Sequence, residues 1–330
     1  MNQGMKQLLS GLVLIAALGA CGGDPGEPLV FTGMCDASAA VAVSKDLFAV
    51  ANDEDNILRF YRLSQPGAPV QSVDLGPMIG TRHQPDKSPE FDLEGATRLG
   101  SRTFWITSHG RNAKGKFAPD RHKLFALEIK ESGTRFQVKV SGRVYTGLVA
   151  DLIREPRLAR FGLAAASRKM PKSPGGLNLE ALAATPEGHL LIGFRNPVPQ
   201  GRALIVPLLN PIDLIDGSPP AFGDPLLLDL GGLGVREIGP AAAGYYIVAG
   251  AVDDEAEPRL FFWPGGSTQP EPAPRRLPLG INPEAICFQD RTDKGDFLLL
   301  SDDGTRKING TDCKLLPESE RRFRAFRIPR

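Results

Sequence analysis

The chain is poor in the residues that zinc and redox sites require. Only four cysteines and four histidines occur among its 330 residues, and His83, His109, His122 and His189 show no zinc-ligand spacing. The sequence also contains no Gly-x-Ser-x-Gly elbow, no Walker loop and no dinucleotide-binding glycine fingerprint. Zinc enzymes, α/β-hydrolases, P-loop nucleotide hydrolases and Rossmann dehydrogenases are therefore not indicated.

Net charge and long apolar runs are missing as well. The formal net charge is +1, and residues 1–20 contain Lys6 and no acid, so the chain without them is neutral. A neutral protein offers no electrostatic basis for binding nucleic acid. One apolar run extends from Leu8 to Leu18, well under the roughly 20 residues that a membrane-spanning helix needs. We expect no other segment to span a bilayer.

The N-terminus has the pattern of a signal peptide over residues 1–20. A cation is followed by a short apolar run, which ends in Leu18-Gly-Ala-Cys21. This ending resembles the lipobox of bacterial lipoproteins, which implies cleavage before Cys21 and stable anchoring through several acyl chains on that residue. Residues 21–28 are then a Gly- and Pro-rich tether. The alternative is a secreted protein in which Cys21 is incidental.

The residue after the lipobox cysteine bears on location. Gly22 follows Cys21, and no aspartate stands there. This arrangement resembles outer-membrane sorting. We therefore expect a protein anchored in the bacterial outer membrane and facing the periplasm.

Glycine and proline are abundant, at 37 and 29 residues, and they punctuate a repeated unit. In three copies of this unit, one residue stands ten positions before the start of a strongly apolar strand. We call it the slot residue. These pairs are Ser38 with Phe48, Glu94 with Phe104, and Glu180 with Leu190. Looser copies start from Glu237 and Glu284. Each copy continues into a further strand that begins with a basic residue or lies close to one.

Three or four short strands that recur about every 55 residues are typical of a β-propeller. We predict an all-β fold with five blades, in which residues 29–330 form a single domain. A degenerate sixth blade would lie at Tyr145–Pro174 or Pro207–Leu230, and a two-domain β-sandwich is the less regular alternative. The strand-like Leu29–Phe31 is placed to supply the outer strand of the last blade and close the ring.

Residues 148–177 do not fit the repeat. Apolar residues at helical spacing, with Pro156 allowing a break, predict one or two short helices. Six cations and two acids occur in this segment, so it carries a clear positive charge within a neutral protein. We expect this basic insertion to join the last strand of one blade to the first strand of the next.

Several motifs resemble a bacterial family known only as domain of unknown function 3616. They are residues 33–40, Asn52–Asn56, Asp92–Gly95, Trp105–Asn112, Asn178–Leu182, Gly193–Asn196 and Val206–Asn210. The resemblance covers nearly all of the chain after the signal peptide and implies no activity. A shorter likeness, to phytase-like esterase propellers, is confined to the Asp-x-Glu-Gly strand start. Asn178 and Asn282 depart from that motif at its first position, so the likeness implies the fold more than the chemistry.

The slot residues predict a charged channel mouth. The first strand of each propeller blade lines the central channel, so Glu94, Glu180, Glu237 and Glu284 should ring one end of it. Second strands run antiparallel and end at the same face. The residues there are Asp53, Glu54, Asp55, His109, Arg111, Arg195, Asp253, Asp302 and Asp303.

Carboxylates around one narrow mouth need raised pKa values or neighbouring cations. In one interpretation Arg111, Arg195 and Arg236 pair with the glutamates and staple blade to blade. In the other, a calcium ion takes oxygen ligands from the mouth. The ligands would then be Asp53, Glu94, Glu180 and Glu284. The sequence leaves both interpretations open.

Two functions follow from these alternatives. The first is a binding module on the membrane, with an anionic small molecule, a glycan or a protein partner at the mouth. The second is a calcium-dependent hydrolase of phosphate or related esters. No complete catalytic set is visible, which favours the binding module. We expect the chain to act as a monomer.

The remaining cysteines predict a disulfide. With Cys21 acylated, Cys35, Cys287 and Cys313 are left, in an oxidising compartment. Cys35 lies just before the first blade and Cys313 after the second strand of the last, so both are expected at the mouth face. Ring closure then favours a Cys35–Cys313 bridge, with Cys287 as a buried thiol. The rival pairing is Cys287–Cys313.

Overall fold

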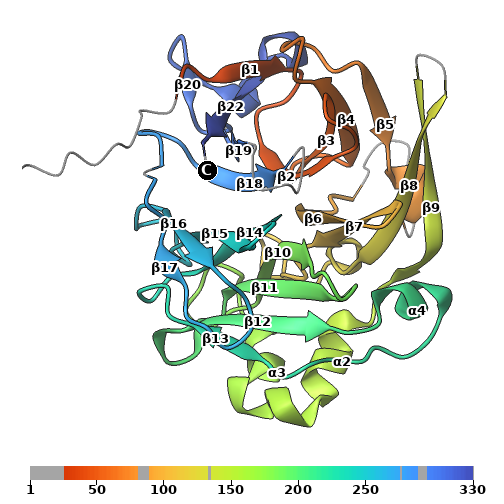
Figure 1. Cartoon of the computed structure of the whole chain (residues 1–330), viewed down its shortest axis with the longest axis vertical. Helices are drawn as coiled ribbons and strands as arrows, with labels where there is room; N and C mark the ends of the chain where they lie inside the picture. Colours follow the sequence, from red (N-terminus) through yellow and green to blue (C-terminus); the bar gives the residue numbers. More distant parts are fainter. Residues whose placement is uncertain (1–25, 81–88, 133–134, 276, 289–295, 330) are drawn as a thin grey trace, which may run out of the picture.

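The computed structural model describes residues 26–80, 89–132, 135–275, 277–288 and 296–329. Over these residues the chain forms a five-bladed β-propeller, in which each blade is a four-stranded antiparallel sheet (Figure 1). The predicted propeller with five blades is confirmed. The predicted signal peptide and the lipidation site Cys21 lie outside the described residues.

Blades 1 to 4 each run outward from the channel in chain order. Blade 1 contains β2 (Ala37–Ala42), β3 (Leu47–Asn52), β4 (Ile57–Arg62) and β5 (Gln71–Asp74). Blade 2 contains β6 (Leu93–Leu99), β7 (Arg102–Thr107), β8 (Leu124–Ser132) and β9 (Arg135–Tyr145). Blade 3 contains β10 (Asn178–Ala184), β11 (Leu190–Asn196), β12 (Ala203–Leu208) and β13 (Leu226–Leu228). Blade 4 contains β14 (Gly234–Ala241), β15 (Gly244–Gly250), β16 (Arg259–Trp263) and β17 (Glu271–Pro272).

Blade 5 closes the ring with strands from both ends of the chain. Its order from the channel outward is β18 (Pro283–Cys287), β19 (Phe297–Ser301), β22 (Arg322–Ile328) and β1 (Leu29–Thr32). Leu29 pairs with Ala325 and Thr32 with Arg322, so the predicted closure by the first strand is confirmed. A small hairpin, β20 (Lys307–Ile308) with β21 (Thr311–Asp312), lies between β19 and β22.

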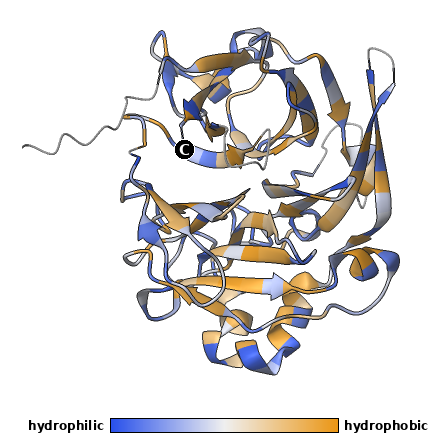
Figure 2. Cartoon of the chain, in the orientation of Figure 1, coloured by the Kyte–Doolittle hydropathy of each residue, from blue (hydrophilic) through white to orange (hydrophobic). Residues whose placement is uncertain are grey.

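The apolar core is divided among the five spaces between neighbouring blades. Trp105 of blade 2, for example, packs in one cluster with Ala49 of blade 1, and Phe104 packs with Ile192 of blade 3. Corresponding clusters join blades 3 and 4, 4 and 5, and 5 and 1. Figure 2 shows the hydrophobic residues concentrated in the strands. Each inner strand is thus buried on both faces, which explains its nearly continuous apolar sequence.

The helices are short. They are α1 (Gly76–Ile79), α2 (Leu148–Arg154), α3 (Leu163–Ala166) and α4 (Pro211–Asp216), with 3-10 helices at Pro119–Arg121, Pro156–Phe161, Pro199–Gly201, Cys313–Leu315 and Glu318–Glu320. Within the described ranges, none of them combines the length and the apolar character needed to cross a membrane.

The predicted basic insertion is present as α2, a 3-10 helix and α3, between β9 and β10. Leu148, Leu152, Leu158 and Leu163 join the core cluster between blades 2 and 3, and the helices lie beside the outer strands of blade 3 (Figure 1). Neither segment considered for a sixth blade forms one: the first is this insertion, and the second belongs to blade 3 and α4.

A disulfide joins Cys35 to Cys313, which are separated by 278 residues. Both sulfur-bearing residues are fully buried beside Ile308. Cys287 is buried on β18 and takes no part in this bridge. The predicted pairing is confirmed, and the rival Cys287–Cys313 pairing is wrong.

Candidate functional site

Every innermost strand carries a β-bulge near its start. At each bulge one residue has no partner on the neighbouring strand, which re-aims its side chain. The five bulged residues are Ser38, Glu94, Glu180, Arg236 and Glu284. These are the slot residues in structural terms. The prediction placed Glu237 at this position of blade 4, but the structure places Arg236 there, one residue earlier.

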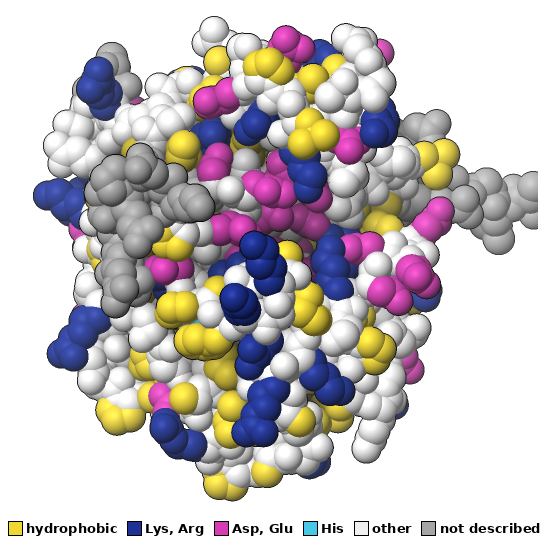
Figure 3. Space-filling model, turned by 180° about the vertical axis from the view of Figure 1, so that it is seen from behind, with side chains coloured by type: hydrophobic (Ala, Val, Ile, Leu, Met, Phe, Trp, Pro, Cys, Tyr) yellow, Lys and Arg dark blue, Asp and Glu magenta, His cyan; other side chains and the backbone are white. Residues whose placement is uncertain are grey.

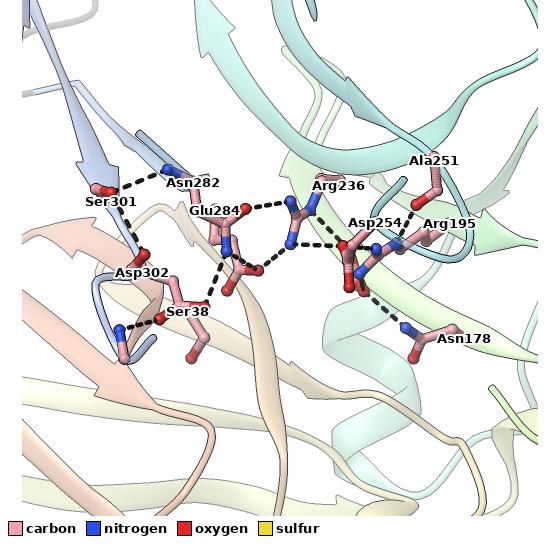
Figure 4. A network of polar contacts seen from close by, with 12 residues as sticks. Ser38, Asn178, Arg195, Arg236, Ala251, Asp254, Asn282, Glu284, Ser301 and Asp302 are labelled. Atoms are coloured by element: carbon pink, nitrogen blue, oxygen red, sulfur yellow. Dashed lines mark hydrogen bonds and ion pairs between the residues drawn. The ribbon is translucent and has the colours of Figure 1, made fainter. Parts of the chain in front are cut away.

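A second tier of residues lies two positions before each bulge. Its members are Asp36, Asp92, Asn178, Gly234 and Asn282. Side chains of the two tiers from different blades meet at the channel mouth. In Figure 4 Arg236, Asn282 and Glu284 point toward one another, and Asp302 lies beside Asn282. The Ser38 hydroxyl instead donates to the Leu93 carbonyl at 2.6 Å and so links blade 1 to blade 2. The repeat spacing in the sequence therefore identifies a real geometric feature, a polar mouth built by all five blades.

One half of the mouth is an ion-pair network on blades 3, 4 and 5. Arg195 is 2% exposed; its Nη1 donates to Glu180 Oε1 at 2.7 Å and its Nε to the Ala251 carbonyl at 2.9 Å. Its Nη2 contacts Asp254. The guanidinium hydrogens of Arg195 are therefore committed to protein acceptors.

Arg236 continues this network into blade 5. Its Nη1 donates to Asn282 Oδ1 at 2.6 Å, and its Nη2 contacts Glu284. Its Nε lies 3.6 Å from Glu180 Oε2. Lys172 of the insertion adds a further ion pair, at 2.7 Å to Asp254. Arg195 and Arg236 thus join blades 3, 4 and 5, as the staple interpretation predicts.

The other half of the mouth, on blades 5, 1 and 2, is acidic. Its members Asp36, Asp53, Glu94 and Asp302 form no ion pair with a lysine or arginine among the residues that the structure describes. Burial, together with Asp302 and Glu54, raises the pKa of Asp36 to about 7. Figure 3 shows acidic side chains gathered in the hollow middle of this face, with Lys and Arg side chains beside them. We call Asp36, Asp53, Glu94 and Asp302 the acidic cluster.

The acidic groups interact with one another across blades. Burial and then Glu284, Asp302 and Asp36 raise the pKa of Asp53 well above its usual value. Burial and neighbouring carboxylates, first Asp92, likewise raise the pKa of Glu94. Burial and neighbouring carboxyl groups thus make Asp36, Asp53 and Glu94 bind a proton more tightly than ordinary carboxyl groups do, unless a cation compensates their charge.

The acidic cluster is tightly built around Asp36. A hydrogen bond joins the Asp36 and Asp302 side chains, and Asn282 Nδ2 donates to Asp302 Oδ2 at 2.9 Å. The turn after β19 leaves no room for a side chain at Gly304, since a Cβ there would lie 1.7 Å from Asp36 Oδ1. Asp53 Oδ1 is buried and has no hydrogen-bond partner. An acceptor of this kind is open to a donor or a cation.

The remaining predicted residues lie around this centre. Glu237 is 1% exposed and accepts hydrogen bonds from the backbone of Ile238 and Ile286, which links blade 4 to blade 5. Burial raises the pKa of Glu237 well above its usual value. Glu54 is exposed and pairs with Lys314 at 2.9 Å.

Arg111 and His109 lie beside the mouth on blade 2. Arg111 donates to the carbonyls of Ser167 and Gly115, at 3.0 and 2.9 Å. His109 is 1% exposed, and its Nδ1 lies 2.7 Å from the Thr107 carbonyl. Burial lowers the pKa of His109 to about 3 and that of His122 to about 4. Both rings are therefore neutral, and neither belongs to the acidic cluster.

The mouth offers oxygen donors of the type that calcium prefers. Within the described residues, however, no three Asp, Glu, His or Cys side chains are arranged to hold a metal ion. Glu180, one of the four predicted ligands, is bound to Arg195 instead. The carboxylate oxygens of the mouth are thus suitable ligands for a hard cation, but the four predicted ligands do not gather around one point.

Sequence reasoning missed Asp36, Asp92 and Asp254 as residues of the mouth. The first two carry a visible signal, because Asp-x-Ser and Asp-x-Glu stand at equivalent positions before β2 and β6. Arg236 was predicted as a partner of the glutamates, but its place as the slot residue of blade 4 was assigned to the neighbouring Glu237. Asp254 lies in a loop after β15 and reaches the mouth through Arg195, Arg236 and Lys172.

A protein family described as "Protein of unknown function (DUF3616)" matches residues 130–306. No curated protein matches the sequence.

Solved structures share the fold at low identity. Glutaminyl cyclase from Myxococcus xanthus is 12% identical, with a TM-score of 0.45 and coverage of 93% of this chain and 96% of that one. A gluconolactonase from Xanthomonas campestris is 13% identical, with a TM-score of 0.40 and coverage of 95% and 82%.

A larger protein shares part of the arrangement. It is the extracellular domain of a protein described as a hybrid two-component system of B. thetaiotaomicron, 11% identical with a TM-score of 0.33. The match covers 81% of this chain, which spans only 25% of that domain. None of these likenesses bears on the function.

Proposed function

The chain belongs to the DUF3616 family, whose description gives no activity, and from its own side chains we propose that it is a lipid-anchored binding protein that takes a positively charged ligand at the acidic mouth of its propeller. The ligand would be a small cation or the cationic group of a larger molecule. The proposal concerns binding and includes no chemical step.

The acidic cluster carries this proposal. Asp36, Asp53, Glu94 and Asp302 approach one another from three blades without a pairing lysine or arginine in the described chain. Burying carboxyl groups together is costly unless they are protonated or paired. A ligand cation would pair with them, lower their pKa values and release protons.

A cation is favoured over an anionic ligand because the terminal nitrogens of Arg195 and Arg236 already have protein acceptors. The donors of Arg195 contact Glu180, Asp254 and a backbone carbonyl. Those of Arg236 contact Glu284 and Asn282. An anion or an acidic glycan would have to break these ion pairs, which are buried and costly to disrupt.

The ester hydrolase needs a metal-held water at the mouth. The described carboxyl groups supply no set of three placed around one point, and two of the four ligands expected, Glu180 and Glu284, are paired with Arg195 and Arg236. We therefore argue for binding, and treat calcium as one of the cations to be tested.

The lipid anchor completes the proposal. The tether of residues 21–28 leads directly to β1, which begins at Leu29. Acylated Cys21 would hold the propeller within a few residues of the outer-membrane surface, facing the periplasm. Since the ring closes with its own strands, we propose that it acts as a monomer.

Calorimetric titration tests the binding site. Calcium chloride and spermidine are titrated separately into the protein at pH 7, in buffers that differ in ionisation enthalpy. We expect at least one of them to bind with release of protons. Asp36→Asn with Glu94→Gln should weaken binding at least tenfold, because about 1.4 kcal/mol is enough for that factor.

The matched control is Glu257→Gln, an exposed acid far from the cluster in sequence, which should leave binding unchanged. Inorganic phosphate is titrated as the opposing probe. Binding of phosphate without either cation would overturn the proposal, as would cation binding that survives the double substitution.

A further inference from the structure

A second charged surface lies at the rim of the mouth face, formed by a loop of blade 2 and the end of the insertion. Its members are Lys114, Lys116, Phe117, Arg168, Lys169 and Met170. We call it the basic rim patch. It includes no residue of the acidic cluster and none of the network around Arg195.

The loop and the insertion are held together by specific contacts. Arg111 bridges them, donating to Gly115 on the loop and to Ser167 on the insertion. A Cβ built at Gly110 would lie 2.7 Å from Pro171 Cγ, and one at Gly115 3.1 Å from Met170 Sδ. The two segments therefore form one continuous surface.

The patch exposes two large apolar side chains. Phe117 is 62% exposed and Met170 is 38% exposed. The Phe117 ring packs against the His122 ring in a tilted arrangement, with 4.7 Å between the ring centroids. Other strongly exposed apolar residues of the described chain, such as Leu279 and Leu315, lie in other parts of the sequence. Two exposed apolar side chains, on segments that are held together by these contacts, are suited to burial in another surface.

Four cations flank these apolar residues in the sequence. Lys114, Lys116, Arg168 and Lys169 are all exposed, and none of them forms an ion pair within the described residues. No acid occurs in residues 112–119 or 162–176. Figure 3 shows Lys and Arg side chains interspersed with hydrophobic ones below the acidic hollow.

We propose that the basic rim patch docks on an anionic lipid surface. Exposed Phe and Met side chains would enter the headgroup region while the four cations face lipid phosphates. A nucleic acid also attracts cations but gives no general reason to expose Phe117 and Met170. An acidic protein would accept both kinds of side chain, and lipid is favoured over it because the expected anchor at Cys21 holds the propeller beside a membrane. The physiological membrane is the one reached through Cys21, and in that respect alone the inference rests on the proposed function.

Vesicle binding tests this with a chain that starts at Gly22. All described strands lie between Leu29 and Ile328, so this chain keeps the whole propeller, and its melting is compared with that of the full-length protein. This chain carries no lipid. A failure to bind vesicles would therefore contradict the role of the patch and would not bear on the lipid anchor. Vesicles contain phosphatidylcholine alone or with about one-third phosphatidylglycerol, which supplies the negative surface potential.

We expect sedimentation with the anionic vesicles only, weakened by salt. Lys114→Gln with Lys116→Gln should reduce partitioning about 25-fold, at about fivefold for each cation lost. Phe117→Trp should show a blue-shifted emission on anionic vesicles. Leu279→Trp, at a residue 96% exposed, is the matched control and should not shift.

Three results would overturn the inference. They are equal binding to neutral vesicles, an unshifted Phe117→Trp signal on anionic vesicles, and binding to heparin in the absence of vesicle binding. The last result would identify the patch as a polyanion site on a soluble partner.

Discussion

At the residue scale, Asp36 has surroundings that differ strongly from those of an ordinary surface aspartate. It is 6% exposed, hydrogen-bonded to Asp302 and close to Glu54. An aspartate in the unfolded chain has a pKa near 3.9, whereas that of Asp36 is about 7. The folded protein therefore binds this proton more tightly than the unfolded chain does.

This difference makes stability fall as pH rises. The free energy of unfolding decreases wherever the folded state holds more protons, which for Asp36 is between pH about 4 and about 7. Glu284, with a pKa raised to about 8 mainly by burial, acts in the same direction up to that pH. The buried His109 and His122 act in the opposite direction, but only below about pH 6.5, where unfolded histidines gain protons.

We predict that the melting temperature falls between pH 6.5 and pH 8. Asp36 alone accounts for up to about 1 kcal/mol over that window, or roughly 2 °C. Asp36→Asn should flatten this part of the profile, because the amide does not ionise. Scanning calorimetry across the window is the measurement. A profile that stays as steep in the variant would contradict the raised pKa of Asp36.

The ion pairs of Arg195 give a second prediction. Arg195→Glu removes a buried cation and places a third carboxylate beside Glu180 and Asp254. Breaking a buried pair costs about 3 kcal/mol or more, so we expect a melting temperature lower by several degrees. Arg202→Glu, an exposed site nearby in sequence, is the control and should melt within a degree or so of the wild type. Equal melting of the two variants would argue against the staple.

The sequence predicted some residues of the mouth and not others. Equal spacing identified Ser38, Glu94 and Glu180 because the bulge recurs at one point of each repeat. It failed by one residue at Arg236, since a β-bulge inserts a position without a sequence signature. The pairing of Arg195 with a mouth glutamate was predicted, whereas its contact with Asp254 was not, because Asp254 approaches through a loop that the repeat pattern does not constrain.

At the scale of elements, the inner strand of blade 1 and the last blade are joined covalently. Cys35 follows β1, and Cys313 starts the 3-10 helix after β21, so their bridge closes a loop with a sequence separation of 278 residues. The spacing of slot residues and the position of the strands were enough to predict this pair. The insertion was predicted from its helical periodicity, but its contact with the loop around Gly115 was not, because that contact depends on tertiary packing.

Removing the bridge should therefore destabilise the whole ring. Cys35→Ser with Cys313→Ser is expected to lower the free energy of unfolding by up to about 5 kcal/mol, the loop-entropy value for a loop of this length. Denaturant titration under non-reducing conditions measures it. Cys287→Ser serves as the comparison, since it should leave the disulfide-linked peptide in a non-reducing digest; loss of that peptide would show a different pairing.

At the scale of the whole molecule, the regular repeat specified five blades because each blade needs its neighbours to bury both faces. The core clusters between successive blades follow from that requirement. The two segments considered for a sixth blade are apolar enough for a strand. The first forms helices beside blade 3, whereas the second forms α4 and supplies β13 to blade 3 itself. Composition alone does not distinguish these outcomes, since apolar runs of that length suit a strand or a helix.

The lipid anchor also belongs to this scale, and Cys21 lies outside the described residues. We predict that Cys21→Ser leaves the chain unprocessed and without lipid, because the acyl chains are attached to that thiol and to the amine freed by cleavage. Metabolic labelling with a fatty acid in the native host measures it. A variant that still incorporates label would contradict the anchor, whereas recovery in the inner membrane would contradict only the outer-membrane location.

The pairing of β1 with β22 has a consequence for the order in which the propeller can form. The first described strand pairs with the last described strand, and β22 also pairs with β19. A nascent chain therefore has no complete partner for β1 until Ala325, which pairs with Leu29, has been added. A chain without β22 leaves two strand edges and the core between blades 5 and 1 open to water and to proteases. Closure of the ring therefore waits for β22, whatever the order in which the other blades assemble.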